Sequence, residues 1–152
     1  MRQGKRATMK ALAVAVFAAI GATAAGPALT QQQTIKIGLL ATLEGPFAAG
    51  GQDGMRGAEL ALKQRGGTVA GKKIEIIKAS SDAKPDVAVN ATRKLVEQDK
   101  VDIMVGPLSG GEGIAVKEYS KTQPQITFIN GSSGAQATTL VNPSPNFFRF
   151  NT

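Results

Sequence analysis

The stretch from Val101 to Gly113, VDIMVGPLSGGEG, constrains the fold most, because a short apolar run turns abruptly into a glycine-rich loop. An apolar run of this length and branching is typical of a strand that is buried on both faces of a parallel sheet. Ser109 follows the turn and is placed to cap a helix that begins near Gly110. The first N–H groups of such a helix are free and favour an anion, helped by the helix dipole. An ordinary strand-to-helix connection is the alternative for this stretch taken alone.

The rest of the chain repeats this alternation of apolar strands and amphipathic helices. The pattern predicts strands at 34–40, 73–79, 101–105 and 125–129, and helices at 51–65, 85–98 and about 110–119. The apolar residues of the first two helices recur at helical spacing: Met55, Ala58, Leu62, then Ala88, Ala91, Leu95. This order predicts an α/β fold, a doubly wound parallel sheet (βαβαβαβ) with helices on both sides.

Three loops then meet at one edge of the predicted sheet. They span residues 43–50, 106–111 and 130–134, and all three are rich in Gly, Ser and Pro. In open parallel sheets, ligands bind beyond the carboxyl ends of the strands, where these loops lie. Small residues allow a ligand to approach main-chain donors closely. We therefore expect a ligand site made largely from main chain.

The amino terminus has the pattern of a secretory signal peptide. Four basic residues precede an apolar run at 11–20, and small residues at 22–25 offer a cleavage site. We assign residues 1–25 to the signal peptide and 26–33 to a polar lead-in. The apolar run is short for crossing a bilayer core of about 30 Å, so a retained membrane anchor is the weaker alternative. Export to the periplasm is the expected outcome.

Charge and cysteine usage narrow the function further. Four of the 18 Lys and Arg residues lie before residue 11, which leaves 14 against 11 Asp and Glu in the rest of the chain. This small, scattered excess is not typical of a nucleic-acid-binding protein. The absence of Cys excludes disulfides and thiol catalysis.

Several catalytic patterns occur but lack their usual context. Residues 66–72 fit G-x-x-x-x-G-K, yet Lys73 replaces the required Ser or Thr and the segment enters a strand. Residues 81–84 fit S-x-x-K, but Pro85 follows at once. With no His and no Cys, the usual triads and zinc sites cannot form. Glu44 and Glu112 could form a carboxylate pair in the cleft, although a ligand contact and a first-turn helix acid are the simpler roles. We expect no catalytic residues, no metal and no cofactor.

Four segments together resemble a known family. They are TIKIGLLATLEGPFAAGGQDGMRGAELAL, GKKIEIIKASSDAKPDVAV, VDIMVGPLSGGEG and NFFRFNT, and they cover the chain from Thr34 to Thr152. Their order is similar to that in the amino-terminal lobe of periplasmic substrate-binding proteins of ABC importers, branched-chain amino-acid binding type. The resemblance implies a type I periplasmic binding fold in which two lobes close around a small ligand.

The resemblance also implies which residues bind the ligand. Its carboxylate would be held by Ser109, Gly110 and Gly111 at the helix start and by Ser132, Ser133 and Gly134 after the fourth strand, with Phe47 as an aromatic wall. Gly50 lies where several relatives have an aromatic residue, and Gly110 lies where a serine is common. An aromatic carboxylate or an amide is therefore a rival to an amino acid.

The expected function is that of a periplasmic solute receptor, not an enzyme, which binds a small carboxylate-bearing ligand and delivers it to an ABC transporter permease. We expect residues 34–145 to form the amino-terminal lobe and 146–152 to begin the crossing to a second lobe, so that the chain is a fragment, monomeric if full length. Two alternatives are a ligand-sensing receptor domain of the same fold and a periplasmic serine hydrolase that uses Ser109 or Ser132.

Overall fold

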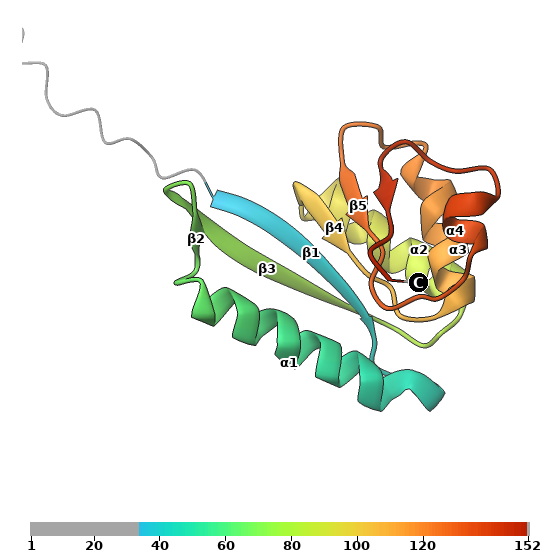
Figure 1. Ribbon diagram of the computed structural model, residues 1–152, viewed down its shortest axis with the longest axis horizontal. Coiled ribbons are helices and arrows are strands. Elements are labelled where there is room, and N and C mark those ends of the chain that lie inside the picture. The colour runs from blue at the N-terminus through green and yellow to red at the C-terminus, as the bar shows by residue number, and fades with distance from the viewer. Residues whose placement is uncertain (1–33, 152) are drawn as a thin grey trace, which may run out of the picture. The chain divides into compact units, whose positions relative to one another are not determined.

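The computed structural model describes residues 34–151, and the predicted signal peptide and the whole of the lead-in lie outside this range. The predicted alternation of strands and helices is confirmed (Figure 1). Six strands form one sheet in the order β2-β3-β1-β4-β5-β6. Their bounds are β1 Thr34–Thr42, β2 Thr68–Val69, β3 Lys72–Ser81, β4 Ile103–Val105, β5 Thr127–Ile129 and β6 Phe147–Phe148. The helices are α1 Ala48–Gln64, α2 Pro85–Arg93, α3 Gly110–Ser120 and α4 Ala137–Leu140, with a 3-10 turn η1 at Gly45–Phe47 and a π-helical turn η2 at Lys94–Gln98.

β1 is the centre of the sheet. It pairs in parallel with β3 along all nine of its residues, from Thr34 opposite Lys73 to Thr42 opposite Ser81, and with β4 on its other side. β5 and β6 extend the sheet in parallel beyond β4. The exception is β2, which pairs antiparallel with β3 through a tight connection. Because the parallel strands share one direction, their carboxyl ends lie at one edge, as predicted.

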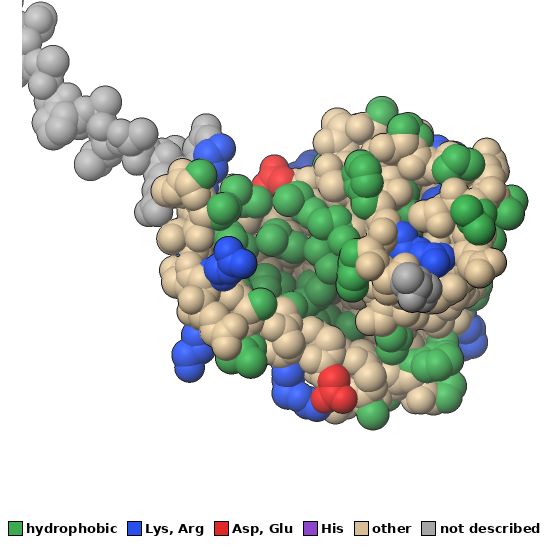
Figure 2. Space-filling view, viewed as in Figure 1, with side chains coloured by type: hydrophobic (Ala, Val, Ile, Leu, Met, Phe, Trp, Pro, Cys, Tyr) green, Lys and Arg blue, Asp and Glu red, His purple; other side chains and the backbone are tan. Residues whose placement is uncertain are grey.

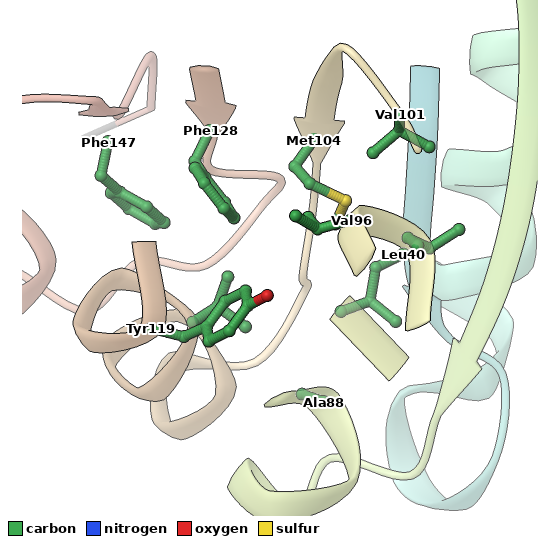
Figure 3. Close-up of a cluster of buried hydrophobic side chains, with 10 residues drawn as sticks. Leu40, Ala88, Val96, Val101, Met104, Tyr119, Phe128 and Phe147 are labelled. Atoms are coloured by element: carbon green, nitrogen blue, oxygen red, sulfur yellow. The ribbon is translucent and has the colours of Figure 1, made fainter. Parts of the chain in front are cut away.

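The two faces of the sheet are covered differently. Alternate residues of β1 point to opposite faces, so Leu40 joins one core cluster whereas Leu39 and Ala41 join the other. The larger cluster lies between the sheet and the pair α2 and α3 (Figure 3); its fully or nearly buried members are Leu40, Ala88, Leu95, Val96, Val101, Met104, Val116, Tyr119, Phe128 and Phe147. The smaller cluster, Leu39, Ala41 and Met55, lies beneath α1.

The face that carries α1 is only partly covered. An apolar groove of about 300 Å³ runs beside α1, lined by Ile37, Leu39, Ile74, Ile76 and Val105 of the strands and by Ala58, Ala61, Leu62 and Arg65 of the helix. Figure 2 shows this hollow as a continuous area of apolar side chains. A parallel sheet is normally covered on both faces. Beside α1, however, apolar side chains of the sheet remain uncovered.

The helix ends follow local chemistry. α1 ends before Gly66 and Gly67, as expected, and both glycines have a positive φ that allows Gly67 N–H to donate to Leu62 O. The predicted helix at 85–98 exists as α2 followed by η2, in which Asp99 N–H donates to Lys94 O five residues back. No helix among residues 34–151 is both long enough and apolar enough to traverse a bilayer.

Polar side chains order the irregular segment between β5 and β6. Asn146 Nδ2 lies 3.0, 2.8 and 2.9 Å from the carbonyl oxygens of Ser120, Gln123 and Ile126. The buried Lys117 donates to the carbonyl oxygens of Val141 and Asn142. These bonds fix the start of β6 against the end of α3.

Phe128→Ala should lower the free energy of unfolding by about 3 to 5 kcal/mol, because it opens a cavity in the larger core cluster. Phe128 is 1% exposed and meets the Tyr119 ring edge-on, with centroids 6.3 Å apart. Phe148→Ala is the matched control, since Phe148 is 54% exposed in the neighbouring strand. Urea unfolding measures both. Equal effects of the two substitutions would contradict this core assignment.

Tyr119 should titrate about two pH units above an ordinary tyrosine. Burial, followed by the hydrogen bond from Tyr119 Oη to Glu97 Oε1, raises the pKa of Tyr119 to about 12 from 10.0. The folded state therefore keeps a proton that the unfolded state loses, so the free energy of unfolding should fall between pH 10 and pH 12. Tyr119 is the one tyrosine and Trp is absent, so absorbance of the tyrosinate reports this group alone.

Urea unfolding at pH 9 and pH 11 provides the second measurement. Tyr119→Phe keeps the ring in the core and should remove that part of the stability loss. A midpoint near pH 10 in the folded protein would contradict the prediction.

Candidate functional site

Three loops meet at the carboxyl edge of the sheet, following β1, β4 and β5. Leu43 N–H donates to Ser81 O, which holds the loop after β1 beside the end of β3. Gly106 follows β4 with a φ of +122°, and a Cβ at this position would come within 2.1 Å of Leu40 O. Gly131 lies in the loop after β5, and a Cβ on Gly131 would come within 2.5 Å of Pro107 O. Glycine at these two positions lets the loop after β4 pack closely against β1 and against the loop after β5.

The start of α3 has two free amides. Ser109 is its N-cap, and the Ser109 Oγ accepts from Glu112 N at 3.4 Å while Ser109 N donates to Glu112 Oε2 at 3.2 Å. This reciprocal capping box satisfies two main-chain donors within the protein. Among residues 34–151, the N–H groups of Gly110 and Gly111 have no acceptor. The expectation of free donors at this helix start therefore holds for Gly110 and Gly111 but not for Ser109.

Glu112 is the buried centre of this edge. Its side chain is 0% exposed and accepts from Thr42 Oγ1 at 2.9 Å, from Ala83 N at 3.1 Å and from Ser109 N. These partners belong to the end of β1, the loop before α2 and the start of α3. No Lys or Arg nitrogen of the described chain lies within 4.0 Å of its carboxylate. Glu112 cannot form the considered cleft pair with Glu44, because it is enclosed and Glu44 is exposed.

The loop after β5 contacts the start of α3. Ser132 and Gly134 are exposed, whereas Ser133 is 0% exposed and its hydroxyl has no hydrogen-bond partner. A Cβ on Gly113 would lie 2.5 Å from Ser133 Oγ, and a Cβ on Gly110 would lie 3.2 Å from Ala135 Cβ. The structure therefore brings Ser109–Gly111 and Ser132–Gly134 together, but it turns the Ser133 side chain inward.

Aromatic residues flank the edge at two places. Phe47, the predicted aromatic wall, is 46% exposed in η1. Phe150 is 73% exposed and lines a mostly apolar hollow of about 230 Å³ together with Gly50, Leu108 and Ser132. Phe150 is not among the site residues predicted from the sequence, because residues 146–152 are expected there only to begin the crossing to a second lobe.

Several polar side chains of this edge are already engaged by other groups of the protein. Ser109 Oγ is used as a helix cap, and the nearby carboxylate of Glu112 is already bonded to three donors. In the S-x-x-K segment, the side-chain hydrogen bond from Lys84 lowers the pKa of Asp82 and raises that of Lys84, so this lysine is an exposed ion-pair partner. Within residues 34–151 no group of three or more acidic side chains could hold a metal ion.

The sequence and the fold are both similar to those of known solute-binding proteins. The sequence matches the model of the periplasmic binding protein family over residues 34–152. The Leu/Ile/Val-binding protein BraC3 of Rhizobium johnstonii is 35% identical over 86 residues, which cover 55% of this chain and 23% of that protein. A solute binding protein of an ABC transporter from Rhodopseudomonas palustris, solved with 3,4-dihydroxybenzoic acid, is 30% identical with a TM-score of 0.71. Its match covers 78% of this chain and 32% of that one.

A further solved relative binds an aliphatic amino acid. The branched-chain amino acid transporter substrate binding protein LivJ from Streptococcus pneumoniae, in complex with isoleucine, is 29% identical with a TM-score of 0.69. The match covers 77% of this chain and 33% of LivJ. The chain thus spans about a quarter to a third of the length of these relatives. All three are named as binding proteins rather than enzymes, which supports the non-enzymatic reading. The sheet order, the loops at its carboxyl edge and the family match over residues 34–152 together establish that the chain belongs to the periplasmic binding protein family.

Proposed function

We propose that this chain supplies one wall of a periplasmic solute receptor that binds a small carboxylate-bearing ligand and delivers it to an ABC transporter permease. The observation that carries the proposal is the pair of free N–H groups of Gly110 and Gly111 at the start of α3. Free amides at a helix start, aided by the helix dipole, favour a carboxylate. Ser132 and Gly134 are exposed on the same loop as Ala135, which lies beside Gly110, and would complete this side of the site.

Two ligand classes fit this wall. The solved relatives are complexes with isoleucine for LivJ and with 3,4-dihydroxybenzoic acid for the R. palustris protein. Both molecules have a carboxylate that could accept from the same two amides, and they differ in the rest of the molecule. Phe47 and the hollow beside Phe150 offer apolar contacts to an aliphatic side chain or to an aromatic ring.

The proposed receptor requires more polypeptide than residues 34–151. Relatives are about three times as long, and closure of a second lobe over the ligand would exclude water from these hydrogen bonds. A single wall offers few charge-assisted hydrogen bonds to offset the loss of ligand freedom on binding. We expect this chain alone to bind with a Kd of about 1 mM or weaker. Export through the predicted signal peptide is part of the same proposal.

NMR titration with L-leucine, benzoate and 3,4-dihydroxybenzoate tests binding in this weak range. The proposal expects saturable chemical-shift changes at the amides of Gly110 and Gly111, which donate to the carboxylate. A titration that leaves these amides unmoved up to tens of millimolar, or that moves only residues elsewhere, would remove the proposal. Glycerol at equal concentration serves as the uncharged control.

Gly110→Pro should weaken ligand binding about tenfold, because it removes one of the two free donors. Proline suits the first helical position, and Ser109 before it already has a ψ of 152°, which proline requires. Gly110→Ala is the matched control, since it adds the same Cβ next to Ala135 and keeps the N–H. The same NMR titration measures both. Equal weakening by the two variants would show that crowding against Ala135, not the lost donor, is responsible.

A further inference from the structure

The buried charge at the ligand edge is not neutralised by a cation. Glu112 accepts hydrogen bonds from a hydroxyl and two main-chain amides, and all three partners are donors, which suits an ionised carboxylate. Lys84, which follows Ala83, is exposed and already paired with Asp82. Glu44 is exposed on the loop after β1 and adds negative charge. Arg149 donates to Ala135 O at 2.9 Å on the loop after β5, beside Gly110, and adds a positive charge to this edge. Glu44, Asp82 and Glu112 against Lys84 and Arg149 still leave one net negative charge among these side chains.

This charge lies close to the free amides. Glu112 is in the same first turn of α3 as Gly110 and Gly111, and its Oε2 is 3.2 Å from the nitrogen of Ser109, the residue before them. A ligand carboxylate that accepts from Gly110 or Gly111 would consequently lie on the order of 6 to 9 Å from the Glu112 carboxylate. Because Glu112 itself is 0% exposed, salt screens its charge less than it screens a surface charge.

We propose that Glu112 is a specificity-determining residue that favours a zwitterionic amino acid over a carboxylate with no positive charge, an inference that rests on the proposed function. A monoanion such as benzoate meets the full repulsion of the buried charge. In an amino acid the ammonium group lies next to the carboxylate and offsets most of that repulsion. At about 8 Å and an effective dielectric constant of about 20, the Glu112 charge would raise the dissociation constant of a monoanion by roughly tenfold or more.

This role differs from that of a structural tie, a side chain that only holds neighbouring segments in place through hydrogen bonds. As a tie, Glu112 would orient the loops after β1 and β4 and would affect all ligands equally. As a source of charge, it would change the ratio of two dissociation constants while the fold stays intact. Glu112→Gln removes the charge and keeps the size. Its one amide oxygen can still accept from Thr42 and Ser109, whereas its NH2 group would face Ala83 N–H. Thr42→Val keeps the charge and removes one hydrogen bond to Glu112.

The test compares L-leucine with 4-methylpentanoate, which has the same side chain and carboxylate but no ammonium group. NMR titration at pH 7 gives both dissociation constants for the wild type, for Glu112→Gln, for Thr42→Val and for Glu118→Gln. Glu118 is exposed at the far end of α3, so its loss of charge is the matched control. We expect the wild type to prefer leucine, Glu112→Gln to narrow that preference about tenfold, and the two controls to change the ratio less than twofold.

Two outcomes would overturn the inference. One is a wild type that binds 4-methylpentanoate as tightly as leucine, a result that needs no variant to fold. The other is an unchanged ratio in Glu112→Gln, or an equal change in Thr42→Val, which would make Glu112 a tie only. If neither ligand binds the wild type, the proposed function itself fails, and this result is distinct from the first two.

Discussion

The hydrogen bonds to the Glu112 carboxylate are the interaction on which the ligand edge depends. The sheet fixes where the strands end, but it does not fix the loops that follow them. Thr42, Ala83 and Ser109 all donate to this one side chain, so three segments that are far apart in sequence share a single acceptor. Because the carboxylate is enclosed, loss of a donor would leave a buried charge undersolvated, a costly state. This one side chain consequently links the end of β1, the loop before α2 and the start of α3.

The spacing of apolar residues in the sequence predicts most of the strands and helices of the fold. The run at 101–105 and the helical repeats of Met55, Ala58 and Leu62 predicted elements that exist close to the expected bounds. The spacing did not predict the short elements, because these depend on contacts between segments that are distant in the sequence. β2 has two residues and exists because the chain reverses at Ala70 and Gly71 to pair with β3. The turn η2 replaces the end of a regular helix where Leu95 and Val96 must both reach the core.

The site was predictable in its main chain and less so in its side chains. Ser109 before two glycines indicates a cap with free amides, and the structure has both features. The direction of a side chain is a different matter. Ser132, Ser133 and Gly134 read alike in sequence, yet only Ser133 packs beneath α3, because Gly113 leaves the necessary space. The full burial of Glu112 likewise depends on donors 70 and 29 residues away.

The central place of β1 sets the order in which the lobe can assemble. β1 is the first strand to leave the ribosome, yet its nearest partner β3 ends at Ser81 and its other partner β4 begins at Ile103. Lys36 and Asp102, which join the starts of β1 and β4, are 66 residues apart. Contacts of such separation close slowly. A nascent chain would therefore keep the apolar run of β1, buried in the finished lobe, without a strand partner through much of its synthesis.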